Sequence, residues 1–296
     1  MTGWGEGRLL ALDTESTGVD VESDRIVTAC AAIVDNGTVA YQRSWLLAVE
    51  VEIPAEAEKV HGISTAKARA EGVDWRQGIR EIAGAVQFAF RAEMSLVLHN
   101  APFDLTLLDR EVRRIGDGGL EDLCGGPVGP VVDTLCVDKA VDRYRPGSRK
   151  LVDTAAMFGV DLGEDAHEAT ADALAACEVA RRMWLRSQLS DDELFGLYAD
   201  RRYPDRLVRD WQRLGRMSAV ELHEAQIGWY KEQSEGFAQY LRRCGNEKRH
   251  EAEQATDRDE FNLAADLRAE AGDLLARADS VDVTWPLRPV SAAVSA

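Results

Sequence analysis

The sequence predicts an α/β domain over residues 1–187, followed by an α-helical extension over residues 188–296. Strand and helix patterns alternate as far as Ser187, which is typical of a sheet with helices packed on it. Asn36-Gly37 separates two apolar runs, and this dipeptide indicates a tight hairpin. After Ser187 the apolar spacing is helical throughout. We therefore expect a sheet that opens with antiparallel strands and an extension made of helices.

The elements of the first domain follow from apolar spacing and from turn residues. The run at 8–12 leads into the turn Asp13–Gly18, and Pro102 suits the first turn of a helix that stops at Gly116. We expect strands at 8–12, 25–34, 38–47, 95–99 and 131–135, and helices at 76–91, 102–116 and 171–184.

The extension begins its long helix with a capping box, Ser218 to Glu221, and we expect this helix to end near Arg243. Its aromatic and aliphatic residues are interpreted as a packing face, with a base-stacking platform as the alternative. Residues 250–278 predict a charged helix, either solvated or paired with another helix. The segment 283–287 is expected to be extended and to dock back on the body.

Composition limits the classes of function. The chain has 35 Lys and Arg against 52 Asp and Glu, a net charge of −17, which counts against tight unaided binding of long duplexes but not against trimming of an end. The 45% of hydrophobic residues suffices for a core. Five scattered cysteines, no signal-peptide pattern and no membrane-spanning run lead us to expect a cytoplasmic protein that does not bind membranes.

Acidic residues at the ends of strands and helices are the informative feature. Asp13 and Glu15 are two apart on a strand, so both point to one face, and Asp104 falls in the first turn of a helix. Asp172 lies on a helix, and we place His167 in the loop or frayed turn before it. Carboxylate oxygens without Cys or a second His favour Mg²⁺ or Mn²⁺ over zinc. Two such ions would clamp a scissile phosphate.

Three motifs carry a resemblance to a known family. They are Asp13-Thr14-Glu15 with Thr17-Gly18, the run from His99 to Asp104, and His167 five residues before Asp172. Val60–Ile63, Asp133-Thr134 and Lys150-Leu151 agree further. Over residues 7–187 the chain resembles the DEDDh exonucleases, the superfamily that includes the proofreading epsilon subunit of bacterial DNA polymerase III. The extension is similar to tails of actinobacterial members.

The resemblance implies a ribonuclease H-like mixed five-stranded sheet flanked by helices, and 3′–5′ exonuclease chemistry on nucleic acid 3′ ends. The expected substrate is a single-stranded or frayed 3′ end of DNA. We predict that Asp13, Glu15, Asp104 and Asp172 hold two divalent cations and that His167 is the general base. By resemblance, the substrate-binding residues are Thr14, Thr17, Gly18, His61, Asn100 and Phe103.

Simpler interpretations stand beside these assignments. Phe103 could be a core aromatic, His61 could cap its loop, and Asn100 could fix the strand–helix turn. Asp133 is interpreted as structural, and His99, His223 and His250 as structural or solvent-facing. Three further acids, Asp109, Glu111 and Glu168, are expected to be solvated.

Two other functions remain open at this stage. One is RNA trimming, because no 2′-hydroxyl pocket is legible in the sequence. The other is a non-catalytic nucleic-acid or protein-binding module on the same fold. The extension could dimerise the chain, contact a protein partner such as a polymerase or clamp, or shield an apolar patch.

Overall fold

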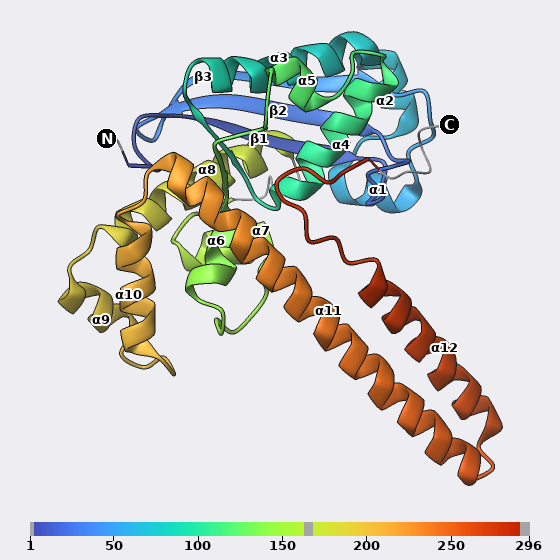
Figure 1. Ribbon diagram of the computed structural model, residues 1–296. Coiled ribbons are helices and arrows are strands. Elements are labelled where there is room, and N and C mark those ends of the chain that lie inside the picture. The colour runs from blue at the N-terminus through green and yellow to red at the C-terminus, as the bar shows by residue number, and fades with distance from the viewer. Residues whose placement is uncertain (1–2, 163–167, 291–296) are drawn as a thin grey trace.

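A mixed sheet forms the centre of the protein in a computed structural model that describes residues 3–162 and 168–290 (Figure 1). Within these residues the sheet has six strands in the order β4-β3-β2-β1-β5-β6. β1 is antiparallel to β2, as β2 is to β3, while the pairs β1–β5, β5–β6 and β3–β4 are parallel. The strands are β1 Arg8–Ser16, β2 Ile26–Asp35, β3 Thr38–Ala48, β4 Val73–Asp74, β5 Ser95–Leu98 and β6 Val131–Asp133.

The predicted strands correspond to β1, β2, β3, β5 and β6, and the two-residue β4 adds a short edge strand. The hairpin at Asn36-Gly37 is confirmed, since both residues have positive φ (48° and 84°). The strand expected at 131–135 ends earlier, at Asp133. The Asp133 side chain accepts hydrogen bonds from the amides of Leu135 and Cys136 and so begins a helix there.

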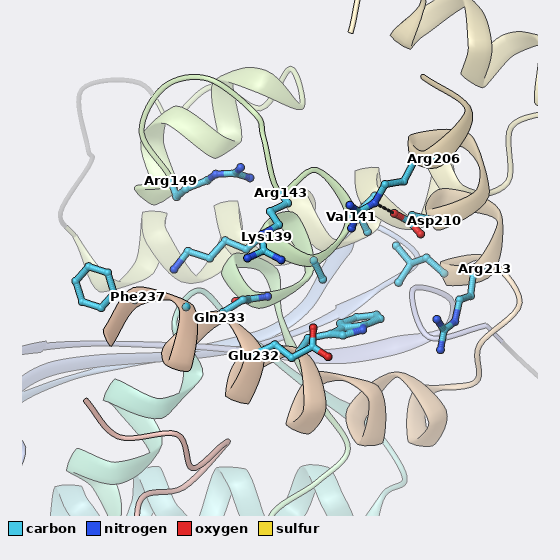
Figure 2. A pocket seen from close by; sticks show the side chains of 14 residues that line it. Lys139, Val141, Arg143, Arg149, Arg206, Asp210, Arg213, Glu232, Gln233 and Phe237 are labelled. Carbon is cyan, nitrogen blue, oxygen red and sulfur yellow. Dashed lines mark hydrogen bonds and ion pairs between the residues drawn. The ribbon is translucent and has the colours of Figure 1, made fainter. Parts of the chain in front are cut away.

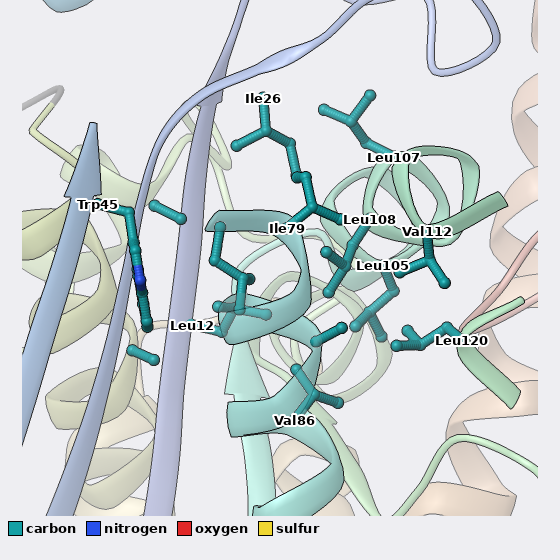
Figure 3. Close-up of a cluster of buried hydrophobic side chains, with 14 of the residues drawn as sticks. Leu12, Ile26, Trp45, Ile79, Val86, Leu105, Leu107, Leu108, Val112 and Leu120 are labelled. Atoms are coloured by element: carbon teal, nitrogen blue, oxygen red, sulfur yellow. The ribbon is translucent and has the colours of Figure 1, made fainter. Parts of the chain in front are cut away.

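One face of the sheet is covered by α3, α4 and α5 (Figures 1 and 3). Leu10 and Leu12 of β1 point to this face and pack in a core with Ile79 and Leu108. Further apolar residues of α3 and α4, among them Ile82 and Leu105, are buried in the same core. These helices are α3 Trp75–Arg91, α4 Ala101–Arg114 and α5 Leu120–Cys124, and two short helices, α1 Ala55–His61 and α2 Thr65–Glu71, precede them.

The opposite face is covered by α8 (Ala169–Ser187), with α6 (Thr134–Val141) and α7 (Leu151–Met157) beside it. Leu9 and Ala11 of β1 point to this side and pack with Ala173 and Val179. Both faces of β1 are thus buried, which explains its nearly continuous apolar sequence. Odd-numbered residues of β1 face α8 and even-numbered residues face α4, an alternation that decides where the acids of the site point.

The extension consists of four helices within the described residues: α9 Asp191–Tyr198, α10 Pro204–Leu214, α11 Ala219–Asp257 and α12 Phe261–Asp279. α9 and α10 add buried residues to the second core, among them Trp211 at 1% exposure. α11 runs from the body outward, and α12 returns beside it in an antiparallel hairpin (Figure 1). Small residues at the contact, including Ala252 and Ala271, allow close approach of the two helices.

The structure corrects two expectations about this hairpin. The capping box at Ser218 and Glu221 is present, but α11 continues past Arg243 to Asp257. The second helix begins at Phe261 rather than at residue 250, after a break at 258–260. The helix pairing that was one of the two alternatives for this segment is therefore what the structure contains.

The apolar residues of α11 do not form a single packing face. Leu222 and Leu241 are buried as expected. Ile227, Phe237 and Tyr240 are 45%, 48% and 51% exposed, so the prediction that they pack is wrong. α11 packs on α6 and β6 of the body with one side and on α12 with another side. These three side chains lie on the part of its surface that is left open.

The C-terminal segment docks on the body, as predicted. Trp285 is 4% exposed, packs 4.9 Å from the ring of His223, and donates from Nε1 to Asp133 at 3.2 Å. Beyond it, the Arg288 amide donates to Thr106 Oγ1, and the Arg110 guanidinium donates to the Pro289 carbonyl. The α11–α12 hairpin is therefore tied to the body at both ends.

Two acids expected to be solvated are buried. Asp109 is 0% and Glu111 1% exposed, because each meets arginines on or beside α4. Glu168 is exposed, as expected.

In the part of the chain that the structure describes, no helix is long and apolar enough to cross a membrane.

Candidate active site

Three carboxylates converge between the end of β1 and the start of α8. Asp13 and Glu15 are odd-numbered residues of β1, so both side chains lie on the α8 side of the sheet. Asp172 comes from the first turn of α8. One carboxylate oxygen from each residue lies within 4.8 Å of the others, a spacing suited to a shared cation.

Asp104 approaches from the other side of β1. It lies in the first turn of α4, as predicted, and is 4% exposed. Its Oδ1 accepts hydrogen bonds from the amide and the hydroxyl of Thr14, at 3.1 and 2.7 Å. Thr14 is even-numbered and faces α4, so the residue between the two acids of β1 holds the fourth acid in place. Asp104 lies outside the compact group of three, but it is close enough for its charge to raise the pKa of Asp13 and of Glu15.

The turn that delivers Asp104 is held by Asp133. Asn100 adopts a left-handed conformation (φ 81°) between β5 and α4, and the amides of Asn100 and Ala101 donate to the Asp133 carboxylate at 3.0 and 3.1 Å. The same carboxylate caps α6 and accepts from Trp285. With its acceptor capacity used in this way, Asp133 has a structural role, and Asn100 fixes the strand–helix turn.

The acids share a negative field. Burial and then the charges of Asp104, Asp172 and Glu15 raise the pKa of Asp13 well above its usual range. Burial, followed by the charges of Asp172 and Asp104, raises the pKa of Glu15 to about 8. Burial raises the pKa of Asp104 to about 7 in spite of the hydrogen bonds from Thr14. No described Lys or Arg forms an ion pair with Asp13, Glu15 or Asp104, so a divalent cation would relieve this repulsion.

Comparison with known proteins agrees with this geometry. A model of the exonuclease family matches residues 10–180, more than half of the chain. DNA polymerase III subunit epsilon of Rickettsia prowazekii is 30% identical over 176 residues, which are 58% of this chain and 72% of that protein. An uncharacterized exonuclease of Escherichia phage 186 is 31% identical over 180 residues, 57% of this chain and 84% of that one. The chain belongs to the exonuclease family.

Solved structures support the fold. Exonuclease I of Escherichia coli, in a zinc-bound complex with ssDNA, has a TM-score of 0.53 and 19% identity. The match covers 64% of this chain and 43% of that chain, so this chain spans less than half of that neighbour. The DEDDh-type 3′–5′ exonuclease resemblance and the ribonuclease H-like fold predicted from the sequence are confirmed.

The remaining residues predicted to bind substrate have partners within the exonuclease itself. The Thr17 hydroxyl donates to Asp24 at 2.6 Å, and a Cβ on Gly18 would lie 2.5 Å from the Asp24 carboxylate. Both residues therefore shape the turn after β1. His61 Nδ1 accepts from the Ile63 amide at 3.2 Å, so it does cap its loop. Burial lowers the pKa of His61, against the opposing effect of the nearby Ser16 backbone.

Two of the residues predicted to bind substrate, Phe103 and His61, are partly exposed. Phe103, in the first turn of α4, is half-buried against the first core. His61 lines a cavity of about 420 Å³ together with Glu168 and Thr170, which flank the start of α8. Contact of these side chains with a terminal nucleotide stays a prediction. His167 lies outside the described residues.

Some residues that build the site carry no recognisable signal in the sequence. Trp285 meets Asp133 across 152 positions of sequence, and no spacing rule links the two. His99 was predicted to be structural or solvent-facing; it is structural, and its partners were not foreseen. Its Nε2 donates to the Arg149 carbonyl at 2.9 Å, and its Nδ1 lies 2.8 Å from Thr134 Oγ1. Burial lowers the pKa of His99, which favours the neutral ring.

Proposed function

We propose that this 3′–5′ exonuclease is metal-dependent, acts on single-stranded or frayed 3′ ends of DNA, and uses His167 as its general base. The observation that carries the proposal is the convergence of Asp13, Glu15 and Asp172 within 4.8 Å, with Asp104 beside them. Such a group of acids is unfavourable by itself and favourable around divalent cations.

The donor set fits Mg²⁺ or Mn²⁺, because the described ligands are carboxylate oxygens. Two cations bound here would polarise the scissile phosphate and stabilise the leaving 3′ oxygen. Asp13, Glu15 and Asp172 would hold the cations on the α8 side of β1. Asp104, positioned by Thr14, would complete the set from the α4 side.

We assign the proton transfer to His167. In the sequence it stands two residues before Ala169, where α8 begins, and five residues before Asp172. A neutral imidazole can take the proton of the attacking water near pH 7. The turn at Asn100, held by Asp133, would orient Asp104 without entering the chemistry.

DNA is favoured over RNA as substrate by the kinds of protein that are similar to this chain. The relatives include subunits of a DNA polymerase, and the structural neighbour was solved with ssDNA. The fold alone does not choose between the two sugars.

Within the chain, we propose that residues 1–187 form the exonuclease domain and residues 188–296 an extension. The family match ends at residue 180 and α8 ends at Ser187. Because α9 and α10 share the second core, the first part of the extension also supports the domain.

The decisive experiment is digestion of 5′-labelled single-stranded DNA, and of an RNA of the same sequence, with and without Mg²⁺. Wild type should shorten the DNA from its 3′ end in a ladder, and Asp13→Asn should not. Shortening of the RNA at the same rate as the DNA would contradict the DNA preference. Full activity with EDTA would contradict the metal dependence.

A further inference from the structure

A groove of about 560 Å³ lies between α10, α11 and the segment that begins with α6 (Figure 2). Its charged lining is mainly basic, which is the reverse of the chain as a whole, whose net charge is −17. Five basic residues line it, Lys139, Arg143, Arg149, Arg206 and Arg213, against the two acids Asp210 and Glu232. Basic side chains from three separate segments are thus collected in one concave surface.

Several of these charges are not neutralised within the protein. Lys139, Arg143 and Arg213 form no ion pair with any described residue, and Arg143 and Arg213 are exposed. Arg149 is committed to Asp138 at 2.6 Å, and Arg206 meets Asp210 at 3.3 Å. Unpaired positive charges on the walls of a groove concentrate the field and attract a polyanion.

Aromatic side chains line the same groove. Phe237 of α11 is 48% exposed, and Trp229, two turns earlier on the helix, is half-buried. An exposed phenyl ring beside unpaired cations offers a stacking surface for a base next to contacts for phosphates. This combination suits a single strand, whose bases are free to stack, better than a duplex.

The groove continues toward the catalytic turn. A neighbouring cavity of about 340 Å³ shares Lys139, Gln233 and Phe237 with it and reaches Asn100. Asn100 begins α4, whose first turn carries Asp104. In addition, the carbonyl of Arg149 accepts a hydrogen bond from His99, the residue before Asn100. One end of the basic groove is therefore continuous with the loop that delivers a catalytic acid.

We propose that this groove binds the sugar–phosphate backbone of the single strand whose 3′ end occupies the catalytic site. The proposal rests on the proposed function and gives α10 and α11 a role in substrate binding. Lys139 and Arg143 contact phosphates, and Phe237 stacks on a base at the end of the groove nearer to Asn100.

The test compares substrates that do and do not reach the groove. One is a single-stranded DNA of about 20 nucleotides, and the other is the p-nitrophenyl ester of thymidine 5′-monophosphate, which fills only the catalytic site. Lys139→Gln/Arg143→Gln should lower the ratio of kcat/KM for the oligonucleotide to that for the ester by about tenfold. The slope of log KM against log salt should fall by about 1.4, since each phosphate contact to a single strand contributes about 0.7. Phe237→Ala should lower the same ratio about fivefold.

The matched control is Lys231→Gln/Arg209→Gln, which removes the same charge from two exposed residues outside the groove lining. It should keep the wild-type ratio and salt slope. Equal behaviour of the groove variant and this control would overturn the proposal. Fluorescence anisotropy of the labelled oligonucleotide, with EDTA to prevent cleavage, tests the groove even if the wild type hydrolyses neither substrate. Weaker binding by the groove variant would then support the groove while the proposed function failed, and unchanged binding would reject the groove.

Discussion

Two groups of carboxylates in this protein lie close to the same sheet but obtain their counter-charges differently. Asp109, Glu111 and Asp138 are buried and meet arginines of the same chain, with the Asp138 oxygen 2.8 Å from Arg145 and 2.6 Å from Arg149. Asp13 and Glu15, at the end of β1, have no such partner among the described residues. Burial and the charges of neighbouring acids raise the pKa of Asp13 and Glu15, whereas the charges of Arg114 and Arg25 oppose the rise that burial causes in the pKa of Glu111.

The difference separates a structural from a functional arrangement of acids. An arginine that forms an ion pair with a buried acid in the folded protein neutralises the charge of that acid, and the pair then has a structural role. Acids that lie close together without such an arginine can be neutralised by cations bound from solution.

Replacing an unpaired acid should remove activity without harming the fold. Asp13→Asn should lower kcat by about 10⁴-fold, because it removes a metal ligand worth several kcal/mol in the transition state. Its metal-free stability should equal or exceed that of wild type, since a repulsion is relieved. Initial rates and urea unfolding measure the two effects. Asp257→Asn, at the exposed far end of α11, serves as the control and should change neither quantity.

His167→Ala should lower kcat by about 10²–10⁴-fold, the usual contribution of a general base. Binding of a single-stranded oligonucleotide with EDTA present should stay at the wild-type level, because the base does not hold the strand. Steady-state rates and fluorescence anisotropy measure these quantities. A rate equal to that of wild type would refute the assignment.

Breaking an internally paired acid should harm the fold instead. Asp138→Ala leaves Arg145 and Arg149 without their buried partner and should lower the free energy of unfolding by about 3–5 kcal/mol. Urea denaturation measures the loss. Asp153→Ala, at an exposed position on α7, should change stability by less than about 0.5 kcal/mol. Equal stability of the two variants would contradict the distinction drawn above.

The metal-free protein should lose stability as the pH rises from about 4.5 to 8. The pKa of Glu15 is raised from 4.5 to about 8 in the folded state, so across this window the folded protein holds a proton that the unfolded chain has released. Each pH unit should therefore cost about 1.4 kcal/mol from Glu15 alone. Thermal unfolding at several pH values, with EDTA, measures the slope. Saturating Mg²⁺ should reverse it, because cations bind the ionised acids of the folded state. Stability that does not change with pH in EDTA would contradict the raised pKa of Glu15.

Local patterns explain why the acid positions were predictable. Asp13 and Glu15 follow a short apolar run before a turn, which predicts a strand, and the period of two placed both acids on one side. Asp104 follows Pro102, which marks the first turn of a helix. Each inference needed only neighbouring residues. The antiparallel opening of the sheet and the helical nature of the extension followed from the same kind of reasoning, and the mixed character of the sheet followed from the family resemblance.

Contacts between distant segments could not be predicted in this way. Asp109 and Glu111 were expected in solvent, because a charged residue on a helix is exposed unless something meets it. Their burial depends on how α4 packs against the loop after β1 and against α5, which no local spacing encodes. The basic groove is assembled from α6, the segment after it, α10 and α11 for the same reason. The length of α11 was underestimated because its outer half is stabilised by α12, not by the body.

The docking of Trp285 anchors the second end of the α11–α12 hairpin to the body. Both ends of the hairpin contact the region of Asp133, the first through His223 and Gln226 of α11 and the second through Trp285. A chain shortened just before Trp285 would therefore disturb the catalytic turn from the far end of the sequence. The distal bend at 258–260 forms its hydrogen bonds and its ion pair within the α11–α12 hairpin. A fluorescent label or an inserted tag belongs at that bend, where it would report on the hairpin without touching the chemistry.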